Sequence, residues 1–256
     1  AAAAGGGVAA LPFDTVLIET TGLADPAPIV QVLVQHSGSQ DKFTRLTAIT
    51  WLHALVADGA NQLLPFAAQM TSSADARQHR RVTAAVHAAG AETKILLQIL
   101  HAGRYAFHPL SASASSIKAP TTPFRPRRLS GRGIEATIDD FVRAAALARE
   151  AGYDGVEIMG SEGYLLNQFL APRTNRRTDA WGGSAEKRRR LPVEIVRRTR
   201  AALGADFIIC YRLSMADFVP DGQSWDEIVA LAHRQLARSF DGLLTIIAPR
   251  HPERFE

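Results

Sequence analysis

Short apolar segments that alternate with helical segments constrain the fold of this chain more than any other feature. Strands are predicted where apolar residues run together, at residues 94–100 (KILLQIL), 156–159 (VEIM) and 206–213 (DFIICYRL). Between the first two, apolar residues recur at helical spacing: Ile134, Ile138, Phe141, Ala145 and Ala148. This alternation is the pattern of a parallel α/β sheet with helices packed against it. We therefore expect an α/β fold.

Two of the predicted helices have a recognisable first turn. Ser130 is expected to cap the helix that precedes the strand at 156–159. Ser224 and Glu227 have the spacing of a capping box, which opens a helix running to about residue 236. The alternation of strand and helix therefore continues beyond the strand at 206–213.

Polar side chains lie in or just after the predicted strands. Gln98 lies within the first strand, and Arg212 lies near the end of the third. The second strand runs into a loop, residues 160–164, that carries Glu162 and Tyr164. Such loops carry the chemistry of β/α enzymes. A guanidinium in a run as apolar as 206–213 needs a partner, because an unpaired buried charge is very costly. For His101, which follows the first strand, a structural role and a ligand contact both stay open.

Composition excludes several classes of protein. The 256 residues are 46% hydrophobic, which is enough for a sizeable core. The net charge of +4 comes with arginines spread along the chain, so no nucleic-acid partner is predicted. The single cysteine, Cys210, excludes a disulfide framework and a cysteine metal site, and we expect it to pack in the core. No apolar run reaches the roughly 18 residues of a membrane span. Residues 1–7 lack the basic residues of a signal peptide, so a cytoplasmic protein is expected.

Several motifs carry a resemblance to a known family. Residues 153–190, the sequence LQILHAGR at 97–104 and the sequence MGSEGY at 159–164 resemble the flavin ene-reductases of the Old Yellow Enzyme class. The resemblance covers about residues 64–231. Most relatives carry His at the position of Met159 and His or Asn at that of Glu162, and this pair of differences resembles the 2,4-dienoyl-CoA reductase branch.

The resemblance implies a fold and a set of roles. It implies part of a (β/α)₈ TIM barrel that binds FMN and is reduced by NADPH or NADH, with NADPH favoured by the subgroup. Gln98 would hydrogen-bond the flavin pyrimidine edge, and Arg212 would lie beside flavin N1 and C2=O. Tyr164 would protonate a small-molecule enoyl or dienoyl substrate. Glu162 would orient or tune Tyr164, although a solvated loop carboxylate is an alternative. Full-length relatives of the branch carry an iron–sulfur cluster, which a chain with one cysteine cannot hold.

The two ends resemble other families. The sequence IETTGLADPAP at residues 18–28 is similar to CobW-type GTPases, but the phosphate-binding GxxxxGK[ST] loop is absent from the sequence. Residues 240–256 resemble part of the Kdo transferases. We therefore expect three parts: a GTPase-like fragment at 1–63, a partial barrel at 64–231 and a tail at 232–256, the ends being extensions foreign to the barrel. A non-catalytic chimeric remnant of the barrel and a GTP-binding metal-chaperone fragment are the alternative interpretations.

Overall fold

A computed structural model describes residues 70–89, 94–239 and 244–247 of the chain. Its helices and strands alternate over most of this length. In chain order they are α3 (Ser73–Ala89), β1 (Leu96–Ile99), the 3₁₀ helix η1 (Gly103–Tyr105), β2 (Ala112–Ser113), β3 (Arg127–Arg128), α4 (Gly131–Glu150), β4 (Gly155–Met159), α5 (Leu165–Leu170), α6 (Ala185–Arg188), α7 (Arg190–Leu203), β5 (Ile208–Ser214), α8 (Trp225–Ser239) and β6 (Leu244–Ile247).

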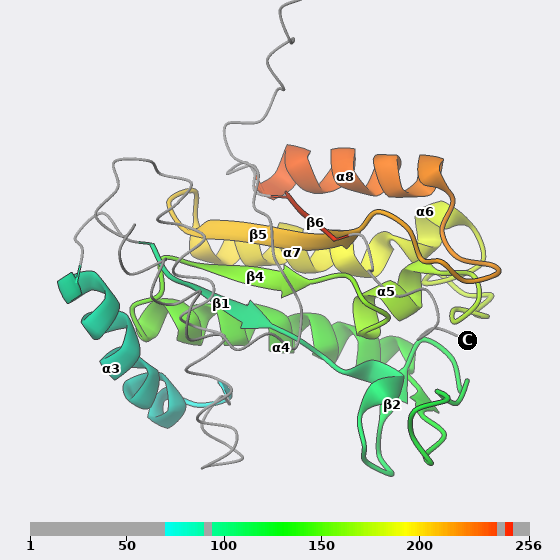
Figure 1. The fold of residues 1–256 in the computed structure, drawn as a ribbon, viewed down its shortest axis with the longest axis horizontal. Helices are drawn as coiled ribbons and strands as arrows, with labels where there is room; N and C mark the ends of the chain where they lie inside the picture. Colours follow the sequence, from blue (N-terminus) through cyan, green and yellow to red (C-terminus); the bar gives the residue numbers. More distant parts are fainter. Residues whose placement is uncertain (1–69, 90–93, 240–243, 248–256) are drawn as a thin grey trace, which may run out of the picture.

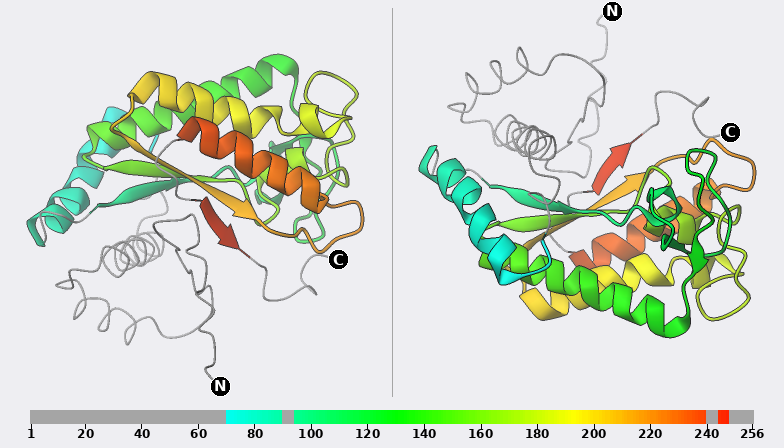
Figure 2. Two further views of the ribbon diagram at one scale, coloured as in Figure 1. Left: turned by 90° about the horizontal axis from the view of Figure 1, so that it is seen from above. Right: turned by 90° about the horizontal axis from the view of Figure 1, so that it is seen from below.

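The described strands include a four-stranded parallel sheet in the order β1-β4-β5-β6. The helices α4, α7 and α8 lie together on one face of this sheet (Figures 1 and 2). Consecutive parallel strands need a crossover connection, and α4, α7 and α8 lie in the connections from β1 to β4, from β4 to β5 and from β5 to β6. The three predicted strands are confirmed with boundaries shifted by one or two residues, and the predicted α/β class is confirmed.

The hydrophobic core lies between the sheet and this helical layer. The five apolar residues predicted to line one face of α4 are all buried in it. They pack with strand residues of the same face, among them Val156, Ile158 and Ile209, each at most 1% exposed. Full burial of such a side chain contributes about 1.5–3 kcal/mol. This packing holds the carboxyl ends of β4 and β5, and the loops that follow them, in fixed positions.

Both predicted helix caps are present. The Ser130 hydroxyl accepts a hydrogen bond from the Gly133 backbone N–H at 3.0 Å. The Glu227 N–H donates to the Ser224 hydroxyl, and the Ser224 N–H donates to the Glu227 carboxylate, each at 3.3 Å. This reciprocal pair of bonds is a capping box, and it satisfies two backbone donors in the first turn of α8.

The sheet and its helices are consistent with part of a (β/α)₈ barrel. The segment predicted as GTPase-like, residues 1–63, lies outside the described residues. At the other predicted boundary, α8 continues without a break through residues 231 and 232, and β6 pairs in parallel with β5. The extensions are therefore not confirmed, and the three-part division stays a prediction. Within the described ranges, no helix is both long and apolar enough to cross a membrane.

Candidate active site

Three polar side chains lie in a row across the sheet. In the parallel register Gln98 of β1 is paired with Glu157 of β4, and Glu157 with Cys210 of β5. Arg212 lies two residues beyond Cys210, and side chains two apart in a strand share a face. Val156, beside Glu157, belongs to the core under the helices, so the row occupies the opposite face of the sheet.

Glu157 joins the two predicted flavin-binding residues. Its carboxylate accepts a hydrogen bond from the Gln98 side-chain amide at 2.6 Å. It also accepts from Arg212 Nε at 2.9 Å and from Arg212 Nη2 at 3.2 Å. Glu157 and Arg212 are 6% and 1% exposed, whereas Gln98 is exposed. Burial lowers the pKa of Arg212 to about 10, so the guanidinium still carries its charge at neutral pH.

Sequence analysis did not single out Glu157. The signal was present: one acidic residue in the otherwise apolar strand GVEIM, and one arginine in the apolar strand IICYRLS. A buried charge needs a partner, so two lone and opposite charges on strands of one sheet predict each other.

The loop that follows β4 carries Glu162 and Tyr164 and is tied to β5. The Gly160 N–H donates to the Arg212 carbonyl at 3.0 Å, and the Glu162 N–H donates to the Ser214 hydroxyl at 3.2 Å. Glu162 has a φ of 61°, a left-handed conformation that costs a residue with a Cβ about 1–3 kcal/mol. Such strain persists where the surrounding contacts impose it, and it is concentrated at functional sites.

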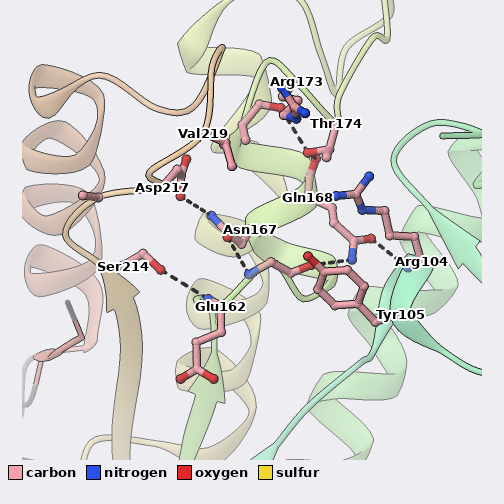
Figure 3. Close-up of a pocket in the computed structure, with 13 residues that line it drawn as sticks. Arg104, Tyr105, Glu162, Asn167, Gln168, Arg173, Thr174, Ser214, Asp217 and Val219 are labelled. Carbon is pink, nitrogen blue, oxygen red and sulfur yellow. Dashed lines mark hydrogen bonds between the residues drawn. The ribbon is translucent and has the colours of Figure 1, made fainter. Parts of the chain in front are cut away.

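Two neighbouring residues of α5 fix this loop through Gly163 (Figure 3). The Gly163 N–H donates to the Asn167 side-chain oxygen at 2.7 Å, and the Gln168 side-chain amide donates to the Gly163 carbonyl at 2.6 Å. Gln168 also accepts from the Arg104 N–H at 3.0 Å, and Asn167 donates to Asp217 at 3.0 Å. Both peptide groups of Gly163 are thus held next to Tyr164. No sequence motif marked Asn167 or Gln168 beforehand.

Tyr164 and Glu162 are half-buried and influence each other. Burial raises the pKa of the Tyr164 phenol, and the nearby Glu162 carboxylate and Tyr105 raise it further. Burial also raises the pKa of Glu162. The Glu162 carboxylate lies 3.7 Å from Arg212 Nη1, so this loop and the polar row are in electrostatic contact. Arg212, Glu162 and Tyr164 therefore lie around the ends of β4 and β5, and Gln98 lies on the neighbouring strand β1, while the role of each stays a prediction.

His101 and the segment after α5 have structural contacts. His101 Nδ1 accepts from the Gly103 N–H at 3.0 Å, and burial is the main cause that lowers the pKa of its ring. Arg177 is buried and donates to Asp179 through Nε at 3.0 Å and Nη2 at 2.6 Å. Asp179 in turn accepts from the Trp181 N–H at 3.0 Å. These bonds order the chain beside the site.

A pocket of about 60 Å³ opens beside the loop of Glu162 and Gly163. Its walls come from η1, the loop after β4, the α5 region, and the end of β5 with the segment that follows it. The lining residues are Arg104, Tyr105, Glu162, Gly163, Asn167, Gln168, Ala171, Arg173, Thr174, Ser214, Ala216, Asp217 and Val219 (Figure 3). A pocket at the carboxyl ends of parallel strands is where α/β enzymes bind their ligands.

Comparison with known proteins identifies the family. Residues 47–251 match the NADH:flavin oxidoreductase / NADH oxidase family. The chain belongs to this family. Membership implies FMN as the prosthetic group and NAD(P)H as the reductant.

The chain spans less than half of the length of the two curated relatives described next. The chain is 43% identical over 148 residues to an NADH oxidase of Thermoanaerobacter brockii, a match that covers 56% of this chain and 22% of the relative. It is 36% identical over 153 residues to an NADPH dehydrogenase of Halalkalibacterium halodurans, covering 57% and 42%. The structure of morphinone reductase in complex with tetrahydroNAD superposes with a TM-score of 0.61 and 31% identity, covering 73% of this chain and 57% of that one.

The family match corrects the expected extent of the resemblance. It begins at residue 47 and ends at residue 251, so it runs into both terminal segments that were predicted to resemble other families. The comparisons give no support for a CobW-type GTPase or a Kdo transferase in this chain. The physical reason is that a short shared sequence does not make a site: the GTPase-like segment lacks the loop that binds phosphate.

Proposed function

We propose that this chain forms the flavin-facing part of an FMN-dependent oxidoreductase that reduces an activated carbon–carbon double bond with NAD(P)H. The contact row of Gln98, Glu157 and Arg212 beside the loop of Tyr164 is the observation that carries the proposal. Bound FMN would supply hydride transfer from the nicotinamide to the acceptor. The chain's own residues would hold the flavin, polarise its ring and protonate the acceptor.

The donor set in this row fits the pyrimidine edge of a flavin. That edge offers carbonyl acceptors and an N–H donor, and the exposed Gln98 carboxamide can both donate to and accept from it. Arg212 keeps its positive charge at neutral pH, so it would favour negative charge on the neighbouring ring. Glu157 would act as a positioning residue, because it fixes both the amide and the guanidinium.

Tyr164 is proposed as the proton donor. A phenol with a raised pKa stays protonated at neutral pH and retains a proton for the acceptor carbon. Glu162 is proposed to tune that pKa, since its carboxylate is among the causes that raise it. The hydrogen bonds from Asn167 and Gln168 to Gly163 would keep the phenol in one position.

For the acceptor we propose an enoyl or dienoyl thioester of the 2,4-dienoyl-CoA type. The sequence MGSEGY, with Met159 and Glu162, supports this branch of the family. A solved complex of 2-naphthoyl-CoA reductase with 2-naphthoyl-CoA superposes with a TM-score of 0.66 and 27% identity, and its name places a CoA thioester in a related protein.

The test combines the chain with FMN, NADPH and a 2,4-dienoyl-CoA in the absence of oxygen. We expect NADPH to bleach the visible flavin absorbance and the thioester to restore it. Tyr164→Phe should leave the bleaching unchanged and slow the recovery about 10²–10⁴-fold, the usual contribution of a general acid. Equal recovery rates in both proteins would refute the role of Tyr164. Failure of the thioester alone, with a simpler enone still reduced, would refute the dienoyl branch only.

A further inference from the structure

Two arginines line the pocket without a carboxylate partner. Arg104 follows Gly103 in η1, and Arg173 follows α5. In the described part of the chain no carboxylate forms an ion pair with either of them, whereas the neighbouring Arg176 and Arg177 pair with Asp221 and Asp179. Both unpaired arginines therefore reach the pocket with their charge uncompensated.

Arg104 is held in place while most of its donors stay unused. Its backbone N–H is fixed by Gln168, and its guanidinium lies over the Tyr105 ring at 5.5 Å from the centroid. The Nε atom is buried and has no hydrogen-bond partner among the described residues. The one side-chain bond is from Nη1 to the Lys118 carbonyl, at 3.5 Å. A buried donor without an acceptor is costly, so it needs an explanation, and a ligand in the pocket would provide one.

The two acids that line the same pocket are already engaged. The Asp217 carboxylate accepts from Asn167, from the Gln223 N–H at 2.8 Å and from the Gln223 side chain at 3.3 Å. Glu162 lies beside Arg212, and in Figure 3 its carboxylate points away from the part of the pocket where Arg104 and Arg173 are drawn. These carboxylates therefore do not neutralise the two arginines.

We propose that this pocket binds a phosphate group of a nucleotide-bearing reactant, with Arg104 and Arg173 as the ligands. A guanidinium presents a planar fork of N–H donors that matches phosphate oxygens in pairs. Arg104 would supply Nε and an Nη from one edge of its fork, and Arg173 would supply its guanidinium from another part of the same lining. The site is separate from the Gln98–Glu157–Arg212 row. The identity of the reactant rests on the proposed function, because a dinucleotide reductant and a CoA thioester both carry a pyrophosphate.

The first experiment titrates inorganic pyrophosphate into the whole chain at low salt and follows the heat of binding. Arg104→Gln and Arg173→Gln should each weaken binding about tenfold or more, since each loses a charged ligand. Arg132→Gln is the matched control, because Arg132 is exposed on α4 and its loss changes the net charge equally. Arg132→Gln should bind pyrophosphate with an affinity within about twofold of that of the wild type, because it changes only the net charge and not the pocket.

A second variant guards against a folding defect. Arg104→Lys keeps the charge and loses the fork, and we expect intermediate affinity with an unchanged circular dichroism spectrum. The idea is wrong if pyrophosphate does not saturate at millimolar concentration, or if Arg104→Gln and Arg132→Gln weaken binding alike.

Two further ligands distinguish the sources of the phosphate. Binding of coenzyme A that weakens in Arg104→Gln would assign the pocket to the thioester, and the same dependence for ADP-ribose would assign it to the reductant. If Arg104→Gln weakens the binding of neither coenzyme A nor ADP-ribose, the proposal is overturned. Flavin absorbance is recorded on the same samples: its loss from every protein, with pyrophosphate binding retained, would defeat the proposed oxidoreductase function and leave the phosphate pocket standing.

Discussion

Glu157→Gln tests the buried contact that joins the predicted flavin-binding residues. The variant keeps the size of the side chain and removes the charge that faces Arg212, leaving the guanidinium in a site that is 1% exposed. Removing one partner of a buried ion pair costs about 3–5 kcal/mol. The glutamine can still offer one acceptor oxygen, so we expect a loss near the lower end, about 3 kcal/mol.

Urea unfolding followed by circular dichroism measures this loss. With a slope of about 2 kcal/mol per molar urea, a loss of about 3 kcal/mol lowers the midpoint by about 1.5 M. The double variant Glu157→Gln/Arg212→Met should be more stable than Glu157→Gln alone, because it also removes the buried positive charge that has lost its hydrogen-bonded carboxylate. Glu194→Gln is the control: its partners Arg197 and Arg198 are on the surface, and it should lose at most about 1 kcal/mol. A loss below that in Glu157→Gln, or a double variant less stable than the single one, would refute the reasoning.

Three further predictions concern the loops around the row. Gln168→Leu should lose about 3 kcal/mol in the same urea assay, because it leaves the buried donors and acceptors bound by Gln168 unpaired; a loss under about 1 kcal/mol would contradict this. Glu162→Gln should lower the pKa of Tyr164, because a negative neighbour disfavours the phenolate. The difference between ultraviolet titrations of each protein and of its Tyr164→Phe counterpart measures this pKa, and an unchanged pKa would speak against the coupling. The Arg177 hydrogen bond is the main cause that lowers the pKa of Asp179 from 3.8 to about 2. Asp179→Asn should therefore lower the free energy of unfolding by about 1 kcal/mol at neutral pH. This difference from the wild type should shrink as the pH falls from 3.8 to about 2, because the wild-type carboxylate becomes protonated; a difference that persists in stronger acid would disprove the prediction.

Much of the fold was predictable because it depends on local patterns. Apolar runs gave the three predicted strands, and helical spacing gave the buried face of α4. Serine at a helix start gave both caps, since the hydroxyl and the orphan backbone donors are only a few residues apart. Parallel strands also explain why Gln98 and Arg212 both reach Glu157: the three side chains share one face of the sheet.

The rest of the site depends on contacts that local patterns do not encode. The hydrogen bonds of Asn167 and Gln168 to Gly163 form in a loop where Glu162 adopts a left-handed φ, a conformation that its residue type does not favour. Asp217 reaches Asn167 from a segment 50 residues away in the sequence. The importance of Arg104 follows from its buried Nε, which has no hydrogen-bond partner among the described residues, and only a three-dimensional arrangement can reveal that.

Retention of flavin tests the central claim most directly. The purified chain is incubated with FMN, desalted, and its visible absorbance is recorded together with that of Gln98→Leu and of the control Gln78→Leu, whose glutamine is exposed on α3. We predict retained flavin with a shifted spectrum in the wild type and in Gln78→Leu, and weaker retention with a changed shift in Gln98→Leu. Equal spectra in all three proteins, or complete loss of flavin from the wild type, would contradict the assignment of the Gln98–Glu157–Arg212 row as the flavin site.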